Sequence, residues 1–425
     1  MMSASIFNWK TITAAIAALL IAVLSWLIAP VWGFFAHNGE APFTPLGWTQ
    51  MPEGEAPAMQ ILHDERYGEA GTQTLAAMEA WRARIGAPSY SAAVSVGGEL
   101  VWEGATGWSD LAAEEAVSTE DLYRIGSTSK AITAIALARL VDRGVIDLDA
   151  PISTYIDTLP NPAWGEITAR QLASHTAGIP HYDGVGETVG LYQMLTLRTH
   201  FDDIRDAVSQ FDESDLLFEP GEGFNYSSLG TVLLAAVMSE AANMSYREIM
   251  RREVFEPAGA DHTIVAPRAP GDPMVGLYYQ EGERYRIWRP VDLSHRLPGG
   301  GWASTPSQLV MMGALMLDEE FISPQTRDAF WTPQSLNNGE TNEQDYAIGW
   351  RWREWEIEGV GPMRNANHGG VSRGSQSWMM VLPDYDMVIA FNMNAKTDPF
   401  WDFGGFYEEI ARNFVPALPT EEPVQ

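Results

Sequence analysis

The sequence contains no cysteine and few basic residues. Of its 425 residues, 26 are Lys or Arg and 56 are Asp or Glu, so the formal net charge is −30 at pH 7. The lack of cysteine excludes disulfide bonds and thiol catalysis. The acidic balance repels phosphate backbones, and we therefore expect no nucleic-acid partner. The hydrophobic content of 46% is ample for a large buried core.

Metal-ligand motifs are also missing. The chain has 8 histidines, and none of them falls in the H-E-x-x-H spacing that places two imidazoles on one face of a helix. His175 lies in a predicted turn, where we expect a hydrogen-bonded packing role. The sequence thus predicts an activity that uses neither a metal ion nor another cofactor.

The chain has few lysines, so a lysine beside a possible nucleophile is informative. The three lysines are Lys10, Lys130 and Lys396, and Lys130 follows Ser127 by three residues at the start of a predicted helix. Residues three apart lie on one helical face, so the amine can reach the hydroxyl. Burial and the positive helix N-terminus both lower a lysine pKa, which would make the neutral amine a base. The alternative is that Ser127 caps the helix and Lys130 is solvated.

A second polar pair precedes another helix. A Pro/Gly turn at 219–223 leads to Tyr226 and Ser228, and the apolar run from Leu229 to Ala242 is typical of a helix. A phenol in this position can relay a proton. The alternative is a buried tyrosine with a satisfied hydroxyl beside a serine cap.

Paired glycines mark a third segment, His368-Gly369-Gly370-Val371. The following pattern predicts a hairpin with strands over 375–382 and 387–394, joined by a Pro-Asp-Tyr-Asp turn. A strand nearly bare of side chains lets a substrate or another backbone approach closely. A bulge or tight turn is the structural alternative.

One motif points to a different nucleophile. Gly370 to Gly374 fits the G-x-S-x-G pattern of a nucleophile elbow, with Ser372 at its centre. An elbow turns from a strand into a helix, whereas residues 375–382 have the pattern of a strand. Ser372 therefore stays a second candidate behind Ser127.

The three segments in this order, S-x-x-K, then Y-x-S, then H-G-G, resemble the serine β-lactamase and penicillin-binding protein superfamily. The similarity is to the branch with class C β-lactamases, D-alanyl-D-alanine peptidases and β-lactamase-like esterases. Flanking residues agree at 122–126, 167–180 and 299–306, and the resemblance spans about residues 72–415. It implies an α+β, β-lactamase/transpeptidase-like fold, in which an antiparallel sheet is flanked by helices and carries an inserted all-helical lobe.

The resemblance also implies roles for individual residues. Ser127 would attack a carbonyl and become acylated, Lys130 would help remove its proton, and Tyr226 would shuttle protons to the leaving group and from water. The backbone N–H groups of Ser127 and Val371 would form the oxyanion hole. The implied substrate-binding residues are Ser228, His368, Gly369, Gly370 and Arg373.

Two departures from the family pattern bear on the substrate. Ser228 replaces an asparagine that contacts the substrate amide in class C β-lactamases, and His368 replaces the lysine of K-T-G. Arg373 is a candidate to replace the lost positive charge. These changes favour a serine hydrolase acting through an acyl-enzyme on esters or small amide and peptide bonds. The alternative function is a non-catalytic cell-envelope module that binds peptide or cell-wall fragments in the same cleft.

The N-terminal segment predicts a membrane location. Residues 11–29 carry no charge, and as a helix they would span about 28 Å, enough to cross a bilayer. We expect a short cytoplasmic segment at 1–10, an uncleaved anchor over 11–35 and an extracytoplasmic, periplasmic-type catalytic domain. A signal peptide cleaved near Val31-Trp32-Gly33, giving a secreted form, is the alternative.

The rest of the chain divides by pattern. Residues 36–70 are rich in Pro, Gly and Glu and are predicted to form a tether. Residues 71–415 are predicted to form the hydrolase domain, and residues 416–425 are predicted to form a disordered tail. Within the domain we expect an opening hairpin over 91–105, helices dominating 131–250, and strands again after 346. A closing helix is predicted over 400–414, beside the opening hairpin.

Overall fold

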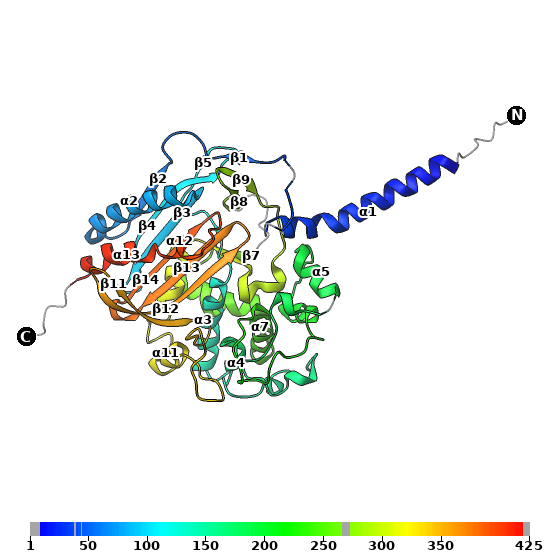
Figure 1. Ribbon diagram of the computed structural model, residues 1–425. Coiled ribbons are helices and arrows are strands. Elements are labelled where there is room, and N and C mark those ends of the chain that lie inside the picture. Colours follow the sequence, from blue (N-terminus) through cyan, green and yellow to red (C-terminus); the bar gives the residue numbers. More distant parts are fainter. Residues whose placement is uncertain (1–8, 38–39, 44, 187, 266–272, 420–425) are drawn as a thin grey trace, which may run out of the picture.

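A central antiparallel sheet separates two groups of helices, and one long helix projects away from them (Figure 1). The computed structural model describes residues 9–37, 40–43, 45–186, 188–265 and 273–419. The sheet has the strand order β11-β12-β13-β14-β3-β4-β2, and all neighbouring strands along it run antiparallel. Its strands are β2 (Ala58–Leu62), β3 (Ser89–Val96), β4 (Glu99–Asp110), β11 (Arg351–Ile357), β12 (Gly361–Ser372), β13 (Ser375–Leu382) and β14 (Met387–Met393).

The middle strands are buried on both faces. Every residue of β13 and of β14 is buried, and both strands are largely apolar. Such continuous apolar stretches occur where helices cover both sides of a sheet. The β3–β4 and β13–β14 pairs confirm the two predicted hairpins.

One face of the sheet is covered by helices from the two ends of the domain. These are α2 (Gly68–Ile85), α12 (Trp401–Gly404) and α13 (Tyr407–Phe414). Their side chains share an aromatic core with Trp102 and Phe391 of the sheet. The predicted closing helix is thus two helices, and it lies over the opening hairpin as expected.

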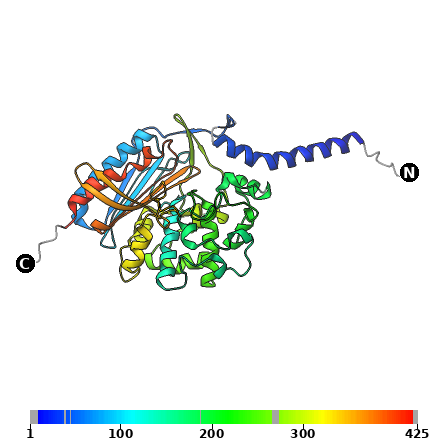
Figure 2. The same ribbon diagram turned by 60° about the horizontal axis from the view of Figure 1, so that its bottom comes forward.

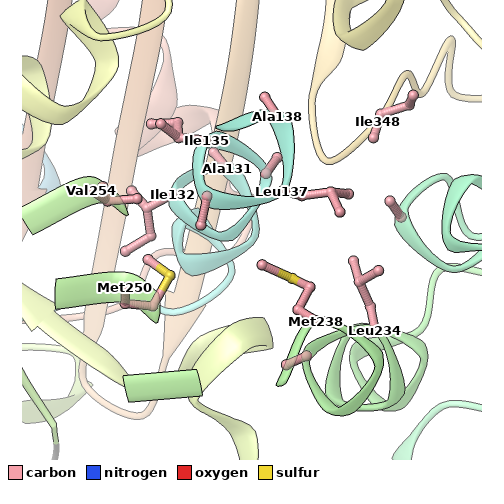
Figure 3. Close-up of a cluster of buried hydrophobic side chains, with 14 of the residues drawn as sticks. Ala131, Ile132, Ile135, Leu137, Ala138, Leu234, Met238, Met250, Val254 and Ile348 are labelled. Carbon is pink, nitrogen blue, oxygen red and sulfur yellow. The ribbon is translucent and has the colours of Figure 1, made fainter. Parts of the chain in front are cut away.

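The other face packs against α3 (Thr128–Asp142) and α10 (Pro306–Ala314), which join the sheet to the helical lobe. Figure 3 shows side chains of α3 facing Leu234 and Met238 of a lobe helix and Met250 of the next. The lobe helices and their neighbours are α4 (Ala169–Ala173), α5 (Thr188–Thr196), α6 (Ile204–Ala207), α7 (Ser228–Ala242), α8 (Tyr246–Met250), α9 (Glu256–Ala258) and α11 (Pro324–Trp331).

The lobe is inserted between the N-terminal and C-terminal strands of one sheet, and Figure 2 shows it as a separate layer beneath that sheet. This arrangement confirms the predicted α+β fold. Short strands bridge the two parts: β5 (Glu115–Ala116), β6 (Tyr123–Arg124), β7 (Ile264–Val265) and β10 (Trp302–Ser304), with a small sheet of β1 (Thr49–Gln50), β8 (Tyr278–Glu281) and β9 (Arg284–Ile287).

The second half of the predicted tether is wrong. Residues 58–62 form β2, which pairs with β4 along its whole length. Trp102 Nε1 also donates a hydrogen bond to Gln60 Oε1 at 2.9 Å. Strand β4 would otherwise present unpaired backbone groups at the sheet edge, and β2 satisfies them. Pro and Glu content alone does not reveal this pairing.

The predicted disordered tail is also corrected at its start. Residues 415–417 form a 3₁₀ turn, and Ala417 and Leu418 pack against the aromatic core beside α13. These apolar side chains gain enough burial to order the backbone there. Residues 420–425 lie outside the described part of the chain.

Helix α1 (Trp9–His37) contains the one stretch, among the described residues, that is long and apolar enough to cross a membrane. This stretch, Thr11–Ala36, has a mean hydropathy of 2.5. Helix α5 packs beside its second half, where Tyr192 donates a hydrogen bond to the Leu27 carbonyl at 3.2 Å. Residues 1–8 of the predicted cytoplasmic segment lie outside the described residues.

Candidate active site

Ser127 lies at the N-terminal end of α3, in the N-cap position. Its hydroxyl accepts no capping hydrogen bond from the helix. By contrast, Ser227 caps α7 by accepting a hydrogen bond from the Gly230 N–H at 2.9 Å. The half-buried Ser127 hydroxyl is thus left for other partners, and the capping alternative does not describe it.

Lys130 points back at this hydroxyl from the first turn of the same helix. Its side chain is buried, with a residue exposure of 2%, so the predicted alternative of a solvated lysine is wrong. Nζ lies 3.3 Å from Ser127 Oγ, 2.9 Å from Ser228 Oγ and 2.9 Å from the carbonyl oxygen of Gly299. No carboxylate of a described residue forms an ion pair with this amine.

The surroundings of Lys130 favour its neutral form. Burial lowers the pKa of Lys130 from 10.5 to about 7, with a smaller contribution from the nearby Arg351 and Arg296 guanidinium groups and an opposing one from Tyr182. A buried ammonium without a counter-ion is costly, so the equilibrium shifts toward the amine. The amine is therefore substantially neutral at physiological pH.

Tyr226 lies in the loop before α7, next to Ser127 and Lys130. The Lys130 amine lies 4.7 Å from the centre of its ring. Burial raises the pKa of the Tyr226 phenol, opposed by the Arg351 guanidinium and by a hydrogen bond with Ser127. The phenol is therefore protonated at neutral pH. Ser127, Lys130, Tyr226 and Ser228 thus converge, as the sequence predicted.

Two histidines hold the loop that carries Tyr226. The Nδ1 atom of His175 accepts a hydrogen bond from the Ser227 N–H at 3.3 Å, and Nδ1 of His181 accepts one from the Ser228 N–H at 3.1 Å. The His175 ring also contacts the Tyr226 ring at 4.4 Å between centroids. His175 thus has the predicted hydrogen-bonded packing role, whereas sequence reasoning missed His181.

Strand β12 approaches the nucleophile loop so closely that only glycine fits. A Cβ atom on Gly370 would lie 1.8 Å from the Ile125 carbonyl oxygen and 2.8 Å from the Thr128 nitrogen. Gly126 has a φ of +50°, and a Cβ there would lie 2.6 Å from the Val371 carbonyl oxygen. These contacts bring the Val371 backbone beside Ser127, the placement that a two-donor oxyanion hole requires.

A cavity of about 400 Å³ opens over these groups. Its floor includes Ser127, Tyr226 and Ser228, and its walls come from the lobe, from β8 and from the end of β12. The remaining lining residues are Arg124, His181, Tyr182, Leu197, Tyr278, Tyr279, Gln280, Trp288, Val291, Leu293, Arg296, Gly299, Gly300, Val371, Ser372, Arg373, Gly374, Lys396 and Asp398.

Three of the five predicted substrate-binding residues, His368, Gly369 and Gly370, do not line this cavity. His368 is fully buried, its Nδ1 donates to the Gly369 carbonyl at 2.7 Å, and its Nε2 lies 2.8 Å from the Tyr346 hydroxyl. Burial lowers the pKa of His368 well below 6.5. Gly369 packs against Trp378 and Phe400 on the other side of the strand. Side chains alternate along a strand, so Gly369 faces away from the reacting groups, whereas His368 lies on their side of β12, with its ring centre 6.3 Å from that of Tyr226.

Ser372 lines the cavity but is not part of a nucleophile elbow. It closes strand β12 and pairs with Ser375, the first residue of β13. The chain thus turns from strand to strand, and no helix N-terminus lies behind the Ser372 hydroxyl. This geometry lacks the strand-to-helix turn that the elbow chemistry needs.

Comparison with known proteins agrees with this geometry. Residues 73–407 match the family model described as Beta-lactamase, which covers most of the chain. The chain belongs to the beta-lactamase family. The family match spans all three motif segments and the inserted lobe.

Relatives within the family carry different names. Penicillin-binding protein 4* of Bacillus subtilis is 26% identical over 325 residues, covering 71% of this chain and 67% of the relative. Esterase EstB of Burkholderia gladioli is 30% identical over 171 residues, covering 38% of this chain and 43% of the relative. The crystal structure of D-amino acid amidase from Ochrobactrum anthropi SV3 superposes with a TM-score of 0.66 at 20% identity, covering 82% and 98% of the two chains. Relatives of the chain thus carry the names of a penicillin-binding protein and an esterase, and the amidase shares its fold.

Some members of the site carry little local signal. Arg351 lies at the start of β11, and its guanidinium stands 5.6 Å from the Tyr226 ring centre. The Gly299 carbonyl reaches Lys130 from a segment 169 residues away. Such contacts depend on tertiary packing, although the glycine run at 299–301 does mark a close backbone approach.

Proposed function

We propose that this beta-lactamase family member is a serine hydrolase that forms an acyl-enzyme on Ser127. The observation that carries the proposal is the buried, unpaired amine of Lys130, 3.3 Å from the Ser127 hydroxyl at a helix N-terminus. A nucleophilic serine needs a neighbouring base that is neutral near the working pH. Lys130 is the group beside Ser127 that meets this requirement.

The hydrogen bonds of Lys130 suit this role. A neutral amine has two N–H donors and one lone pair. The donors can satisfy the Gly299 carbonyl and the Ser228 hydroxyl, each at 2.9 Å. The lone pair then faces the Ser127 hydroxyl and accepts its proton as the oxygen attacks the substrate carbonyl.

Tyr226 acts as a proton relay in this proposal. Its raised pKa disfavours a phenolate, so the phenol takes a proton from Lys130 while passing its own to the leaving group. The same path in reverse activates water for deacylation. The N–H groups of Ser127 and Val371 stabilise the tetrahedral oxyanion, a contribution of about 3 to 4 kcal/mol per donor.

The proposed substrates are esters or small amide and peptide bonds, with esters turned over fastest. His368, in place of a lysine, is buried and neutral and offers no positive charge to a β-lactam carboxylate. Ser228 contacts the Lys130 amine, so its hydroxyl is engaged at the base. Similarity to esterase EstB is consistent with ester hydrolysis.

We also propose that α1 anchors the enzyme in a membrane, with the catalytic domain on the extracytoplasmic side. The apolar stretch Thr11–Ala36 is long enough to span the hydrocarbon layer, and most of its residues are exposed. The domain follows directly, so the cavity would face the aqueous compartment next to the bilayer.

The function is tested by active-site labelling. A fluorophosphonate probe is expected to label the wild-type chain at Ser127, with label and ester turnover both abolished in Ser127→Ala. Ser372→Ala is the matched control and keeps both, because its hydroxyl has no amine beside it. Parallel assays with a short acyl ester, a D-alanyl peptide and a chromogenic cephalosporin rank the substrates. A cephalosporin rate exceeding the ester rate would overturn the preference.

The alternative of a non-catalytic binding module gives a different result. Such a module would bind peptide or cell-wall fragments equally well after Ser127→Ala and would show no covalent labelling. The buried lysine beside the serine favours the enzyme, because a binding cleft has no need of a desolvated amine.

A further inference from the structure

Helix α1 reaches the wall of the catalytic cavity. The ring centre of Phe34, in its second half, lies 4.6 Å from the guanidinium carbon of Arg373, a residue that lines the cavity. Earlier in the helix, the Trp26 carbonyl accepts a hydrogen bond from Arg198 at 3.0 Å. Arg198 directly follows Leu197, which also lines the cavity. Residues 26 and 34 are about 12 Å apart along a helix, so α1 runs beside this wall over that length.

These contacts lie at the depth of the lipid. A helix needs about 20 apolar residues to cross the hydrocarbon layer, and the apolar stretch of α1 begins at Thr11. The span proposed above therefore ends near Pro30, past the contact at Trp26. Helix α5 meets α1 at the same depth, because Tyr192 donates a hydrogen bond to the Leu27 carbonyl at 3.2 Å. The side of the lobe that carries α5 thus lies against the membrane surface, at the base of α1 (Figure 1).

Helix α5 has the composition of a segment that contacts lipid. In a protein of net charge −30, residues 188–197 carry no charge. Val189, Tyr192 and Leu195 are spaced by three residues and lie on one face of the helix. Tyr192 contacts α1 from this face, whereas Val189 is 71% exposed and Leu195 is partly exposed. An exposed apolar face beside a membrane helix gains free energy by entering the lipid interface.

The cavity wall behind α5 is apolar as well. Leu197, directly after the helix, packs with Val291 and Leu293, and all three line the cavity. Trp288 continues this wall, and its ring centre lies 5.1 Å from the guanidinium carbon of Arg373. The proton transfers proposed above use none of these apolar side chains. A wall of this kind binds an aliphatic chain by removing it from water.

We propose that the cavity opens where the aqueous compartment meets the bilayer, between α5 and the end of α1, and that the substrate is an ester with a long aliphatic acyl chain drawn from the lipid. The inference rests on the proposed hydrolase and membrane anchor, and it names the class of ester. The chain lies along Leu197, Val291 and Leu293. The Ser127 Oγ–acyl bond forms as the ester C–O bond breaks, and the alcohol leaves with the proton relayed by Tyr226. Water then cleaves the acyl–serine bond and releases the fatty acid.

The first experiment measures where α5 lies. The chain has no cysteine, so a single introduced thiol is labelled without background. Full-length Val189→Cys carrying a nitrobenzoxadiazole fluorophore is reconstituted in phosphatidylcholine vesicles, where doxyl-labelled phosphatidylcholine is expected to quench most of its emission. Ile61→Cys is the matched control, because Ile61 is a partly exposed residue of β2, on the side of the sheet away from α1 and α5 (Figure 1). Its label is expected to stay unquenched, and equal quenching at the two positions would overturn the inference.

The second experiment measures how the substrate reaches the cavity. Wild-type enzyme in phosphatidylcholine vesicles receives 4-methylumbelliferyl decanoate or butyrate at equal total concentration. The decanoate lies almost entirely in the bilayer, whereas much of the butyrate stays in water. A cavity that opens at the bilayer is expected to cleave the decanoate about 10-fold faster or more. A cavity supplied from water would cleave it more slowly than the butyrate, and that result would overturn the inference.

Modification of the α5 face connects the two measurements. Val189→Cys is treated with (2-sulfonatoethyl) methanethiosulfonate in detergent before reconstitution, which places an anion on this face. The decanoate-over-butyrate ratio is expected to fall about 5-fold or more, because a charge opposes contact with the lipid. The same treatment of Ile61→Cys is expected to leave the ratio unchanged. A ratio that does not respond to the anion at position 189 would contradict entry beside α5.

Placement and turnover fail separately. The quenching measurement is repeated with Val189→Cys in a Ser127→Ala chain, which cleaves no ester, and the same quenching is expected. Quenching at position 189 without wild-type turnover of either ester would reject the hydrolase and leave the membrane contact of α5 standing. Turnover of the butyrate without quenching at position 189 would reject this inference alone.

Discussion

At the scale of single residues, the site depends on one lysine placed where a charge is unfavourable. The Lys130 amine has three oxygen neighbours and no anionic partner among the residues that the structure describes. The same burial that costs folding free energy supplies a base whose pKa of about 7 suits neutral pH. A solvated lysine at this position would remain an ammonium and accept no proton.

This pKa leads to a prediction for the pH dependence of kcat/KM. Only the neutral amine can act as base, so the rate on a short neutral ester is expected to rise about 10-fold per pH unit below 7 and to level off above it. Lys130→Arg keeps a cation that does not deprotonate and is expected to lower kcat/KM by roughly 10³-fold or more across this range. Stopped-flow measurement of the acylation rate provides the check. A flat profile between pH 6 and 8 would contradict the assignment of Lys130.

The sequence revealed some residues of this site and not others for a physical reason. Ser127 and Lys130 are one helical turn apart, so their proximity follows from local geometry. His368 was predicted to bind substrate, but its ring nitrogens are engaged by the Tyr346 hydroxyl and the Gly369 carbonyl, and the contact with Tyr346 depends on tertiary packing. Arg124, Arg296 and Arg373 meet only in the folded chain, and neither spacing nor composition identifies them as a group.

At the scale of secondary structure elements, the site requires close contact between strand β12 and the loop before α3. Gly370 and Gly126 let the two backbones meet at distances that no side chain allows. The paired glycines in the sequence predicted this approach, although not its partner. The contact fixes the Val371 N–H relative to Ser127.

Gly370→Ala tests this contact. The added methyl group would overlap the Ile125 carbonyl, so either the strand or the nucleophile loop must shift. We expect kcat to fall by 10²-fold or more, because displaced oxyanion donors lose most of their effect. Gly186→Ala is the control, since its Cβ meets no atom within 4 Å. Circular dichroism and kcat measured on both variants distinguish a local shift from unfolding, and an unchanged kcat in a folded Gly370→Ala protein would refute the argument.

Helix α1 provides a second prediction at this scale. The Arg198 guanidinium donates to the Trp26 carbonyl at 3.0 Å, and α5 packs beside it, so the domain contacts the helix well before its C-terminal end. Removal of residues 1–37 is expected to move the protein from the membrane fraction to the soluble fraction. The expected loss of membrane binding follows from the exposure of Trp9, Leu19 and Leu20, apolar side chains that favour lipid over water. Membrane retention of the truncated protein would show that another surface binds the bilayer.

The secondary structure elements that a local sequence pattern marks were predicted correctly. The hairpins of β3–β4 and β13–β14 have clear turns, at Gly97-Gly98 and at Pro383 to Asp386. Strand β2 was missed because five residues between prolines and glutamates gain order only by pairing with β4. Edge pairing is a tertiary effect that composition does not report.

At the scale of the whole molecule, the buried histidines link folding to pH. His175, His295 and His368 are each buried, and burial lowers the pKa of each well below 6.5. His175 and His368 lie around Tyr226, whereas His295 accepts a hydrogen bond from Arg296 in the cavity wall. The folded chain therefore keeps three neutral imidazoles in a protein of net charge −30.

These groups predict a loss of stability in mild acid. Because the folded-state pKa lies below the unfolded value of about 6.5, the unfolded chain binds more protons, and stability present above pH 6.5 is lost as pH falls through that value. Each histidine is expected to lower the free energy of unfolding by about 1 kcal/mol between pH 7 and 5.5. Urea titrations of the detergent-solubilised chain at the two values measure the change. His295→Gln is expected to reduce this pH effect by one histidine's share, while the exposed His262→Gln leaves it intact. Equal pH effects in His295→Gln and wild type would show that His295 is already protonated in the folded protein.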